Sequence, residues 1–171
     1  MPMANSSRQA AKQPSSQRDE IRVFLVDDHP IMREGVRAYL TSHSISVVGD
    51  AADAEEALRK VKKAKPDVVV LDVNLPRIDG GELARRLRRL IPKAKLIAFS
   101  IHSSQEYVAW MARCGVHGYV TKDRPTVELL EAIRDVFKGG KHFPAVVTDE
   151  LSAPAPMASP GRRIARRRRA R

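Results

Sequence analysis

Five polar side chains of this sequence are of the kinds that phosphoryl-transfer chemistry uses. They are Asp27, Asp28, Asp72, Ser100 and Lys122. Carboxylates bind hard divalent cations, a carboxylate can attack phosphorus, and a lysine can neutralise the charge that develops. Each of these residues alone has a simpler role as a helix cap, a turn residue or a solvated charge. Their chemistry therefore depends on whether the fold brings them together.

The elements that must position them follow from the hydrophobic pattern. Between Ile21 and Gly140, short apolar runs alternate five times with segments of helical periodicity, which is typical of a parallel α/β sheet. We predict a flavodoxin-like (βα)5 three-layer sandwich whose parallel five-stranded sheet has the order 2-1-3-4-5. The expected strands are IRVFLV (21–26), ISVVGDA (45–51), DVVVL (67–71), KLIAFS (95–100) and HGYVT (117–121).

The expected helices carry their own start signals. These are Pro30, Asp53, Asp79, Ser103 or Ser104, and Asp123 with Pro125. On the first helix, the apolar spacing predicts that Ile31 faces the core. On the last helix, it predicts that Leu130, Ile133 and Phe137 face the core. Cys114 is read as a small packed residue, because a single cysteine cannot form an internal disulfide.

The predicted topology brings the candidate side chains to one edge. In a parallel sheet all carboxyl ends of the strands share an edge, and the order 2-1-3-4-5 puts Asp72 at its centre. The acidic pair after the first strand lies on one side, and Ser100 with Lys122 on the other. Three converging carboxylates repel each other unless a cation is bound, and Mg²⁺ prefers carboxylate, water and phosphate ligands. The sequence therefore predicts Mg²⁺-dependent phosphoryl transfer onto an aspartate.

The charge of the chain is unevenly placed. The formal net charge is +11, of which residues 162–171 supply seven arginines and no acid. We expect a disordered leader at 1–20, a Pro-rich linker at 144–161 and an Arg-rich disordered tail at 162–171. No signal peptide and no apolar run of membrane-spanning length is present in the sequence, so we expect a soluble, cytoplasmic protein without a membrane span.

Four motifs together resemble the receiver domain of bacterial two-component response regulators of the NarL/FixJ type. They are VDDHPIMREGVRAYL, LDVNLPRIDGG, AFSIH and GYVTKD, and the resemblance covers residues 21–143. It implies that Asp72 is the phosphoacceptor and that Ser100 and Tyr119 form the switch. It also implies that Lys122 pairs with the phosphoryl group.

The same resemblance implies the cofactor and the partners. The Mg²⁺ shell would consist of Asp27, partly through water, Asp28, Asp72 and the backbone carbonyl of Asn74. The implied partners are a sensor histidine kinase or phosphotransfer protein, a downstream protein target and a second copy in a homodimer. Proteins of this type normally continue into a helix-turn-helix domain, which the 27 residues after Pro144 are too few to build. We therefore expect output through protein contact. The chemistry would be self-phosphorylation and autodephosphorylation rather than turnover of a separate substrate.

Several alternatives stay open at this point. A haloacid-dehalogenase-like phosphatase also uses an aspartate nucleophile, but it usually has an acid two residues later, where this chain has Asn74. A basic regulator could contact nucleic acid nonspecifically through residues 162–171, although a solvated tail explains the same composition. Trp110 is either an exposed partner contact or partly buried against the sheet. The isomer of the Lys122–Asp123 peptide bond is also open.

Overall fold

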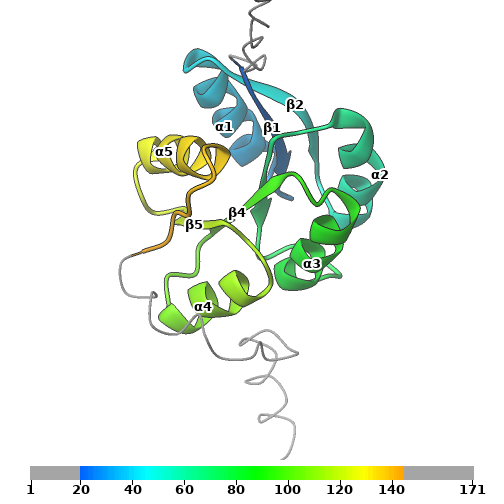
Figure 1. The fold of residues 1–171 in the computed structure, drawn as a ribbon, viewed down its shortest axis with the longest axis vertical. Helices are drawn as coiled ribbons and strands as arrows, with labels where there is room; N and C mark the ends of the chain where they lie inside the picture. The colour runs from blue at the N-terminus through cyan, green and yellow to red at the C-terminus, as the bar shows by residue number, and fades with distance from the viewer. Residues whose placement is uncertain (1–19, 145–171) are drawn as a thin grey trace, which may run out of the picture.

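The structure is a computed structural model that describes residues 20–144 (Figure 1). The strands are β1 (Ile21–Val26), β2 (Ile45–Ala51), β3 (Val68–Asp72), β4 (Lys95–Ser100) and β5 (Gly118–Thr121). The helices are α1 (Pro30–Ser42), α2 (Ala54–Ala64), α3 (Gly80–Leu90), α4 (Gln105–Arg113) and α5 (Thr126–Phe137). The expected leader, linker and tail lie outside the described residues, apart from Glu20 and Pro144.

The sheet has the predicted topology. All five strands pair in parallel, in the order β2-β1-β3-β4-β5, so β3 lies at the centre. Every residue of β3 is buried, as expected for a strand covered on both faces. Each of the five strands lies within one residue of its predicted range. The flavodoxin-like fold is thereby confirmed.

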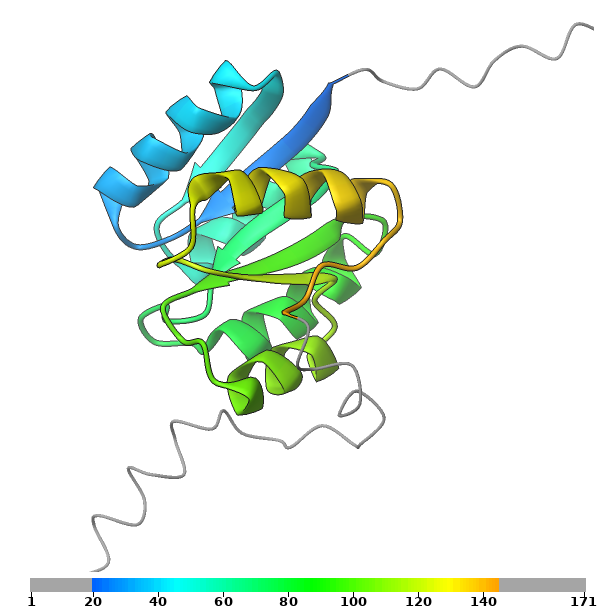
Figure 2. The ribbon, with the colours of Figure 1, turned by 90° about the vertical axis from the view of Figure 1, so that its left-hand side faces the viewer.

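Helices cover both faces of the sheet, as Figures 1 and 2 show: α1 and α5 lie on one face, and α2, α3 and α4 lie on the other. Two hydrophobic clusters match this division. One joins Val23 and Leu25 of β1 to α1 and α5, and the other joins Phe24 and Val26 to α2, α3 and α4. Alternate side chains of β1 therefore pack against the helices on opposite faces of the sheet. Among the described residues, no helix combines the length and the apolar composition needed to cross a membrane.

Most of the predicted helix starts are confirmed. Asp53 and Asp79 accept hydrogen bonds from backbone amides in the first turns of α2 and α3. Ser104, rather than Ser103, caps α4. Two predictions of burial were wrong, because Ile31 is 86% exposed and Phe137 is 39% exposed.

The helix geometry accounts for both exposed residues. Ile31 lies in the first turn of α1, while the buried positions of that helix come later, at Val36 and Leu40. The inner face of α5 runs through Leu129, Ile133 and Val136. Phe137 is one residue beyond Val136, about 100° further around the helix, and so turns toward solvent.

Trp110 is fully buried, which decides between the two readings of this residue. Its side chain belongs to the cluster under α2, α3 and α4. A Cβ added at Gly81 would lie 2.4 Å from Trp110 Cζ2 and 2.9 Å from Cys114 Sγ. The ring thus fills space that only a glycine leaves open. Trp110 is a core residue, and its interpretation as an exposed partner contact was wrong.

A half-buried imidazole at the amino end of the sheet, that of His117, gives a pH prediction. Burial, together with Lys95, Arg88 and Lys141, lowers the pKa of His117 from 6.5 to about 4. The unfolded chain binds a proton at this residue more readily, so its contribution to stability is present above about pH 6.5 and is lost as the pH falls toward 4. We expect His117→Asn to flatten the decline in the free energy of unfolding over that range, measured by urea denaturation. The exposed control His43→Asn should keep the wild-type decline, and an unchanged slope in His117→Asn would contradict the assignment.

Candidate functional site

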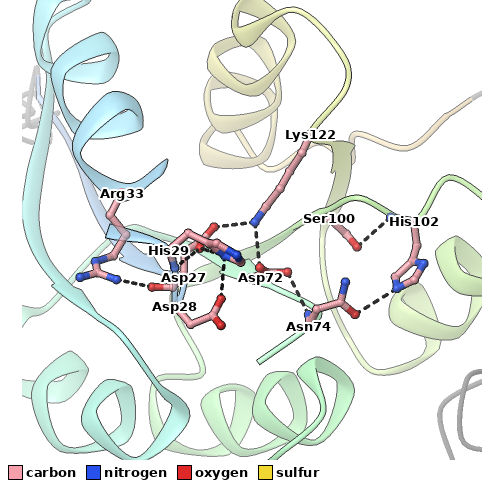
Figure 3. Close-up of polar contacts among 9 residues, drawn as sticks. All are labelled: Asp27, Asp28, His29, Arg33, Asp72, Asn74, Ser100, His102 and Lys122. Atoms are coloured by element: carbon pink, nitrogen blue, oxygen red, sulfur yellow. Dashed lines mark hydrogen bonds and ion pairs between the residues drawn. The ribbon is translucent and has the colours of Figure 1, made fainter. Parts of the chain in front are cut away.

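The predicted site residues lie together at the carboxyl edge of the sheet (Figure 3). Asp72 is the last residue of β3, Asp27 directly follows β1, and Ser100 is the last residue of β4. Lys122 directly follows β5, and its backbone amide donates to the Ser100 carbonyl at 2.8 Å. The short central strand, buried along its whole length, fixes the backbone of Asp72 between its two neighbours.

Lys122 bridges two of the carboxylates. Its Nζ lies 2.6 Å from Asp27 Oδ2 and 2.8 Å from Asp72 Oδ2 (Figure 3). The three side chains are only 8%, 7% and 3% exposed in that order. Burial alone would lower the pKa of Lys122, but hydrogen bonds to Asp27 and Asp72 outweigh it and raise the pKa. The lysine is therefore a fixed cation at the central carboxylate.

Four side chains at this edge could hold a metal ion. Ligand atoms of Asp27, Asp28, His29 and Asp72 all lie within 4.8 Å of one another. Asp28 Oδ1 is buried and makes no hydrogen bond to another described residue, although it lies 2.9 Å from His29 Nδ1. Carboxylate oxygens are the ligands that hard divalent cations prefer, so the three acids fit a Mg²⁺ ion.

Two residues of this corner were missed by the sequence reasoning. His29, the N-cap of α1, donates its backbone amide to Asp27 Oδ1 at 2.8 Å, and its Nδ1 lies 3.2 Å from the same oxygen. Arg33 donates from Nη1 to the Asp27 backbone carbonyl and from Nε to Asp50 Oδ2 at 3.1 Å. His29 directly follows the acidic pair in the sequence, and that position was a usable signal. Arg33 on α1 gave no such sequence signal, because its partner Asp50 lies on β2.

The loop after β3 orients the central carboxylate. The Asn74 backbone amide donates to Asp72 Oδ1 at 2.9 Å, and Gly80 N donates to the Val73 carbonyl at 3.0 Å. The Asn74 side chain points the other way, where its Oδ1 lies 3.0 Å from His102 Nε2 (Figure 3). One carboxylate oxygen of Asp72 thus accepts a hydrogen bond from Lys122, and the other accepts one from the Asn74 main-chain amide. The role of the Asn74 carbonyl as a metal ligand stays a prediction.

The proposed switch residues are already linked in this structure. Ser100 is fully buried, and its Oγ accepts from the His102 backbone amide at 3.1 Å. Tyr119 is also fully buried, and its hydroxyl donates to the His102 carbonyl at 2.7 Å. Burial raises the pKa of Tyr119 to about 12, so the phenol stays a donor.

Comparison with known families decides the identity of the domain. Residues 23–134 match the family model described as "Response regulator receiver domain". The chain belongs to the response regulator receiver family.

Curated relatives of this chain are named as transcriptional regulatory proteins or as response regulators. The transcriptional regulatory protein DegU of Brevibacillus brevis is 35% identical over 78% of this chain and 57% of its own length. The response regulator GacA of Pseudomonas viridiflava is 36% identical over 77% of this chain and 62% of its own. The chain spans about three fifths of the length of these relatives. The two alternatives considered from the sequence, a phosphatase and a nucleic-acid binder, find no support in these matches.

Solved structures agree with the receiver fold. A LuxR-family two-component response regulator from Aurantimonas is 36% identical, with a TM-score of 0.70 over 77% of this chain and 94% of its own. The isolated REC domain of RcsB from Salmonella enterica, in the presence of phosphomimetic BeF3⁻, has a TM-score of 0.69 at 25% identity. That match covers 78% of this chain and all of the RcsB domain. In this receiver domain the Lys122–Asp123 bond is trans, since the described residues contain no cis peptide.

Proposed function

We propose that Asp72 accepts a phosphoryl group from the phosphohistidine of a sensor kinase or phosphotransfer protein. The observation that carries the proposal is the Lys122 ammonium, held between Asp27 and Asp72 at the buried end of β3. A charged lysine beside a carboxylate neutralises the charge of an arriving phosphoryl group, and the carboxylate can act as the nucleophile toward phosphorus. A stabilising ion pair alone is more simply built at the surface, where desolvation costs less.

The transfer can be written with the side chains present. A carboxylate oxygen of Asp72 bonds to phosphorus while the bond from phosphorus to the donor's imidazole nitrogen breaks, and that nitrogen keeps the electron pair. The Asn74 amide holds the carboxylate in place, and Lys122 pairs with the phosphoryl oxygens. A Mg²⁺ ion on Asp27, Asp28 and Asp72 would neutralise the remaining charge. The domain is thus a substrate of phosphorylation that also promotes its own reaction, and not an enzyme acting on other molecules.

The response to phosphorylation would pass through β4 and β5. The phosphoryl group adds acceptor oxygens beside Ser100, whose hydroxyl can donate to them. A shift of Ser100 would move the His102 backbone, because the His102 amide donates to Ser100 Oγ. The same backbone accepts a hydrogen bond from the Tyr119 hydroxyl at the His102 carbonyl. We propose that this changes a surface around α4 and β5 that contacts a downstream protein or a second copy of the chain. We also propose that residues 21–143 form the receiver domain.

The test is phosphorylation by a small acyl-phosphate donor with Mg²⁺, followed by intact-mass analysis. We expect one phosphoryl adduct on the wild type and none on Asp72→Asn, because an amide cannot act as the nucleophile. Glu131→Gln, an exposed change on α5, should be labelled like the wild type. Chelation of divalent cations should abolish labelling.

Three outcomes would count against the proposal. An adduct on Asp72→Asn would place the phosphoacceptor elsewhere, and an unmodified wild type would remove the receiver function. Turnover of a phosphate ester by the wild type would instead favour the phosphatase chemistry that was considered from the sequence.

A further inference from the structure

An open groove of about 580 Å³ lies between α2 and the strands β1 and β2. Figure 1 shows β2 at one edge of the sheet, beside α2. None of the residues that line the groove belongs to the candidate metal and phosphorylation site. The groove is therefore a separate feature of the surface, which phosphoryl transfer does not use.

Part of the lining of this groove is apolar and small. It consists of Phe24, Val48, Gly49 and Ala64. The two strands change register here, because Phe24 pairs with Gly49 and Val48 has no partner in β1. A Cβ added at Gly49 would lie only 2.8 Å from the Phe24 ring. The glycine therefore leaves space at the bulge that a larger residue would fill.

Four cationic side chains line the same groove. They are Arg22, Arg59, Lys60 and Lys63. The Arg22 guanidinium donates to the backbone carbonyls of Ala64 at 2.7 Å and Lys65 at 3.2 Å, so it is held in place without being neutralised. Lys63 makes no hydrogen bond or ion pair with any residue in the range 20–144. Both cations are therefore available to an acidic ligand.

The acids in and next to the groove are already paired. Asp50 is the acid of the lining, and it forms ion pairs with Arg33 at 3.1 Å and with Arg37, both on α1. Glu56 pairs with Lys60 on α2. The groove therefore combines an excess of positive charge with apolar surface. Charge complementarity favours an occupant that carries carboxylates and small apolar side chains.

The shape of the groove favours a peptide as the occupant. Its lining extends from Arg22 to Asp50, which is paired with Leu25, so it follows three steps of β1 or roughly 10 Å at about 3.3 Å per residue. That length matches three to four extended residues. A single-stranded nucleic acid would use exposed aromatic rings for stacking, but Phe24, the aromatic residue of the lining, is only 1% exposed.

The parts of this chain outside the described residues have the wrong charge for the groove. Residues 1–19 contain three basic residues and one acid, and residues 145–171 contain seven arginines and two acids. Both segments carry net positive charge, which the cations of the groove would repel. The occupant is therefore more favourably supplied by another protein.

We propose that this groove binds a short extended segment of a partner protein in which acidic and small apolar residues alternate. Alternation places the two kinds of side chain on opposite sides of an extended segment. The carboxylates would pair with Arg59 and Lys63, and the apolar side chains would pack on Val48 and Ala64. The proposal does not rest on phosphorylation of Asp72, and it can be measured without Mg²⁺ or a phosphodonor.

The first test is fluorescence anisotropy with a fluorescein-labelled peptide GEVEVEG at physiological salt. We expect saturable binding to the wild type and to Asp72→Asn, and binding of the neutral peptide GQVQVQG that is weaker by about fivefold or more. Arg59→Gln combined with Lys63→Gln should weaken binding of GEVEVEG by about fivefold to tenfold. Lys62→Gln combined with Lys93→Gln is the matched control, because it removes the same charge at exposed positions outside the groove. This control should bind like the wild type.

The sign of a charge placed inside the groove gives the decisive comparison. Val48→Glu should weaken binding of GEVEVEG by about tenfold or more, whereas Val48→Lys should not weaken it. Both changes replace the same partly exposed apolar side chain, so lost packing would affect them alike. Amide NMR shifts of Gly49 and Ala64 should follow the same titration.

Four results would each overturn the proposal. They are no saturable binding to the wild type, equal binding of GQVQVQG, equal binding to Val48→Glu and Val48→Lys, and NMR shifts confined to residues outside the groove. Displacement of the peptide by an equal concentration of an oligothymidylate of the same charge would also overturn it, because the groove would then be a general polyanion surface.

Discussion

Replacing Lys122 with methionine is expected to lower the free energy of unfolding by about 3–5 kcal/mol in metal-free buffer at neutral pH. The side chain has a similar length, so the loss comes from charge rather than volume. Asp27 and Asp72 would then face each other in a buried site without a cation. Removing one partner of a buried ion pair leaves the desolvation cost of the others uncompensated.

The same variant should be rescued by the metal. Lys122 occupies oxygens of Asp27 and Asp72 that a divalent cation would also use, so the two cations compete for them. We expect millimolar Mg²⁺ to raise the stability of Lys122→Met by more than that of the wild type, because binding to the native state stabilises it by mass action.

Urea denaturation with and without Mg²⁺ measures both effects. Lys60→Met is the matched control, because Lys60 pairs with Glu56 on the exposed surface of α2. It should cost no more than about 1 kcal/mol and show no extra response to the metal. If Lys122→Met behaved like Lys60→Met, the bridge would be an ordinary surface interaction.

Gly80→Ala is expected to destabilise the domain by about 1–3 kcal/mol or more and to slow phosphorylation of Asp72. A Cβ at position 80 would lie 2.6 Å from Val73 Cα, 3.0 Å from the Val73 carbonyl and 3.1 Å from the Asp72 carbonyl. These are backbone atoms, which cannot rotate away as a flexible side chain would. The β3–α3 loop must therefore shift, and with it the carboxylate that the loop orients.

The chain provides an internal control for this substitution. Gly35 lies on the exposed side of α1, and an added Cβ would meet nothing within 4 Å. Gly35→Ala should stabilise the domain by about 0.5–1 kcal/mol, because alanine favours the helix and restricts the unfolded chain. Thermal unfolding and the rate of acyl-phosphate labelling measure both variants. A Gly80→Ala protein that matched the wild type in both would show that the loop is not constrained as the structure indicates.

The site was predictable because its residues follow from topology. Each polar side chain directly ends or follows a strand, and parallel strands bring these positions to one edge whatever their separation in sequence. Asp27, Asp72, Ser100 and Lys122 were therefore found without coordinates. His29 was missed because a residue at a helix start is normally interpreted as a cap, and its approach to the carboxylates depends on side-chain conformation.

Burial was less predictable where a residue lies at the margin of an element. Ile31 and Phe137 fit the apolar periodicity of their helices, but each lies at a helix end, where the periodicity continues beyond the packed surface. For Trp110 the sequence left exposure and partial burial open, because the space for its ring comes from Gly81 on another helix. Periodicity reports which side of an element is apolar, and it contains no information about where the neighbouring element stops.

His102 joins the site to its surroundings through two different kinds of bond. Its amide and carbonyl, which every residue type has, hold Ser100 and Tyr119. Its imidazole, which is specific to histidine, reaches Asn74 and stacks on Tyr107 at 4.1 Å between centroids. Position 102 can therefore change its side chain while the backbone hydrogen bonds that link it to Ser100 and Tyr119 are retained. The contacts that depend on the histidine ring and those that depend on the backbone are thus separable by substitution at this one residue.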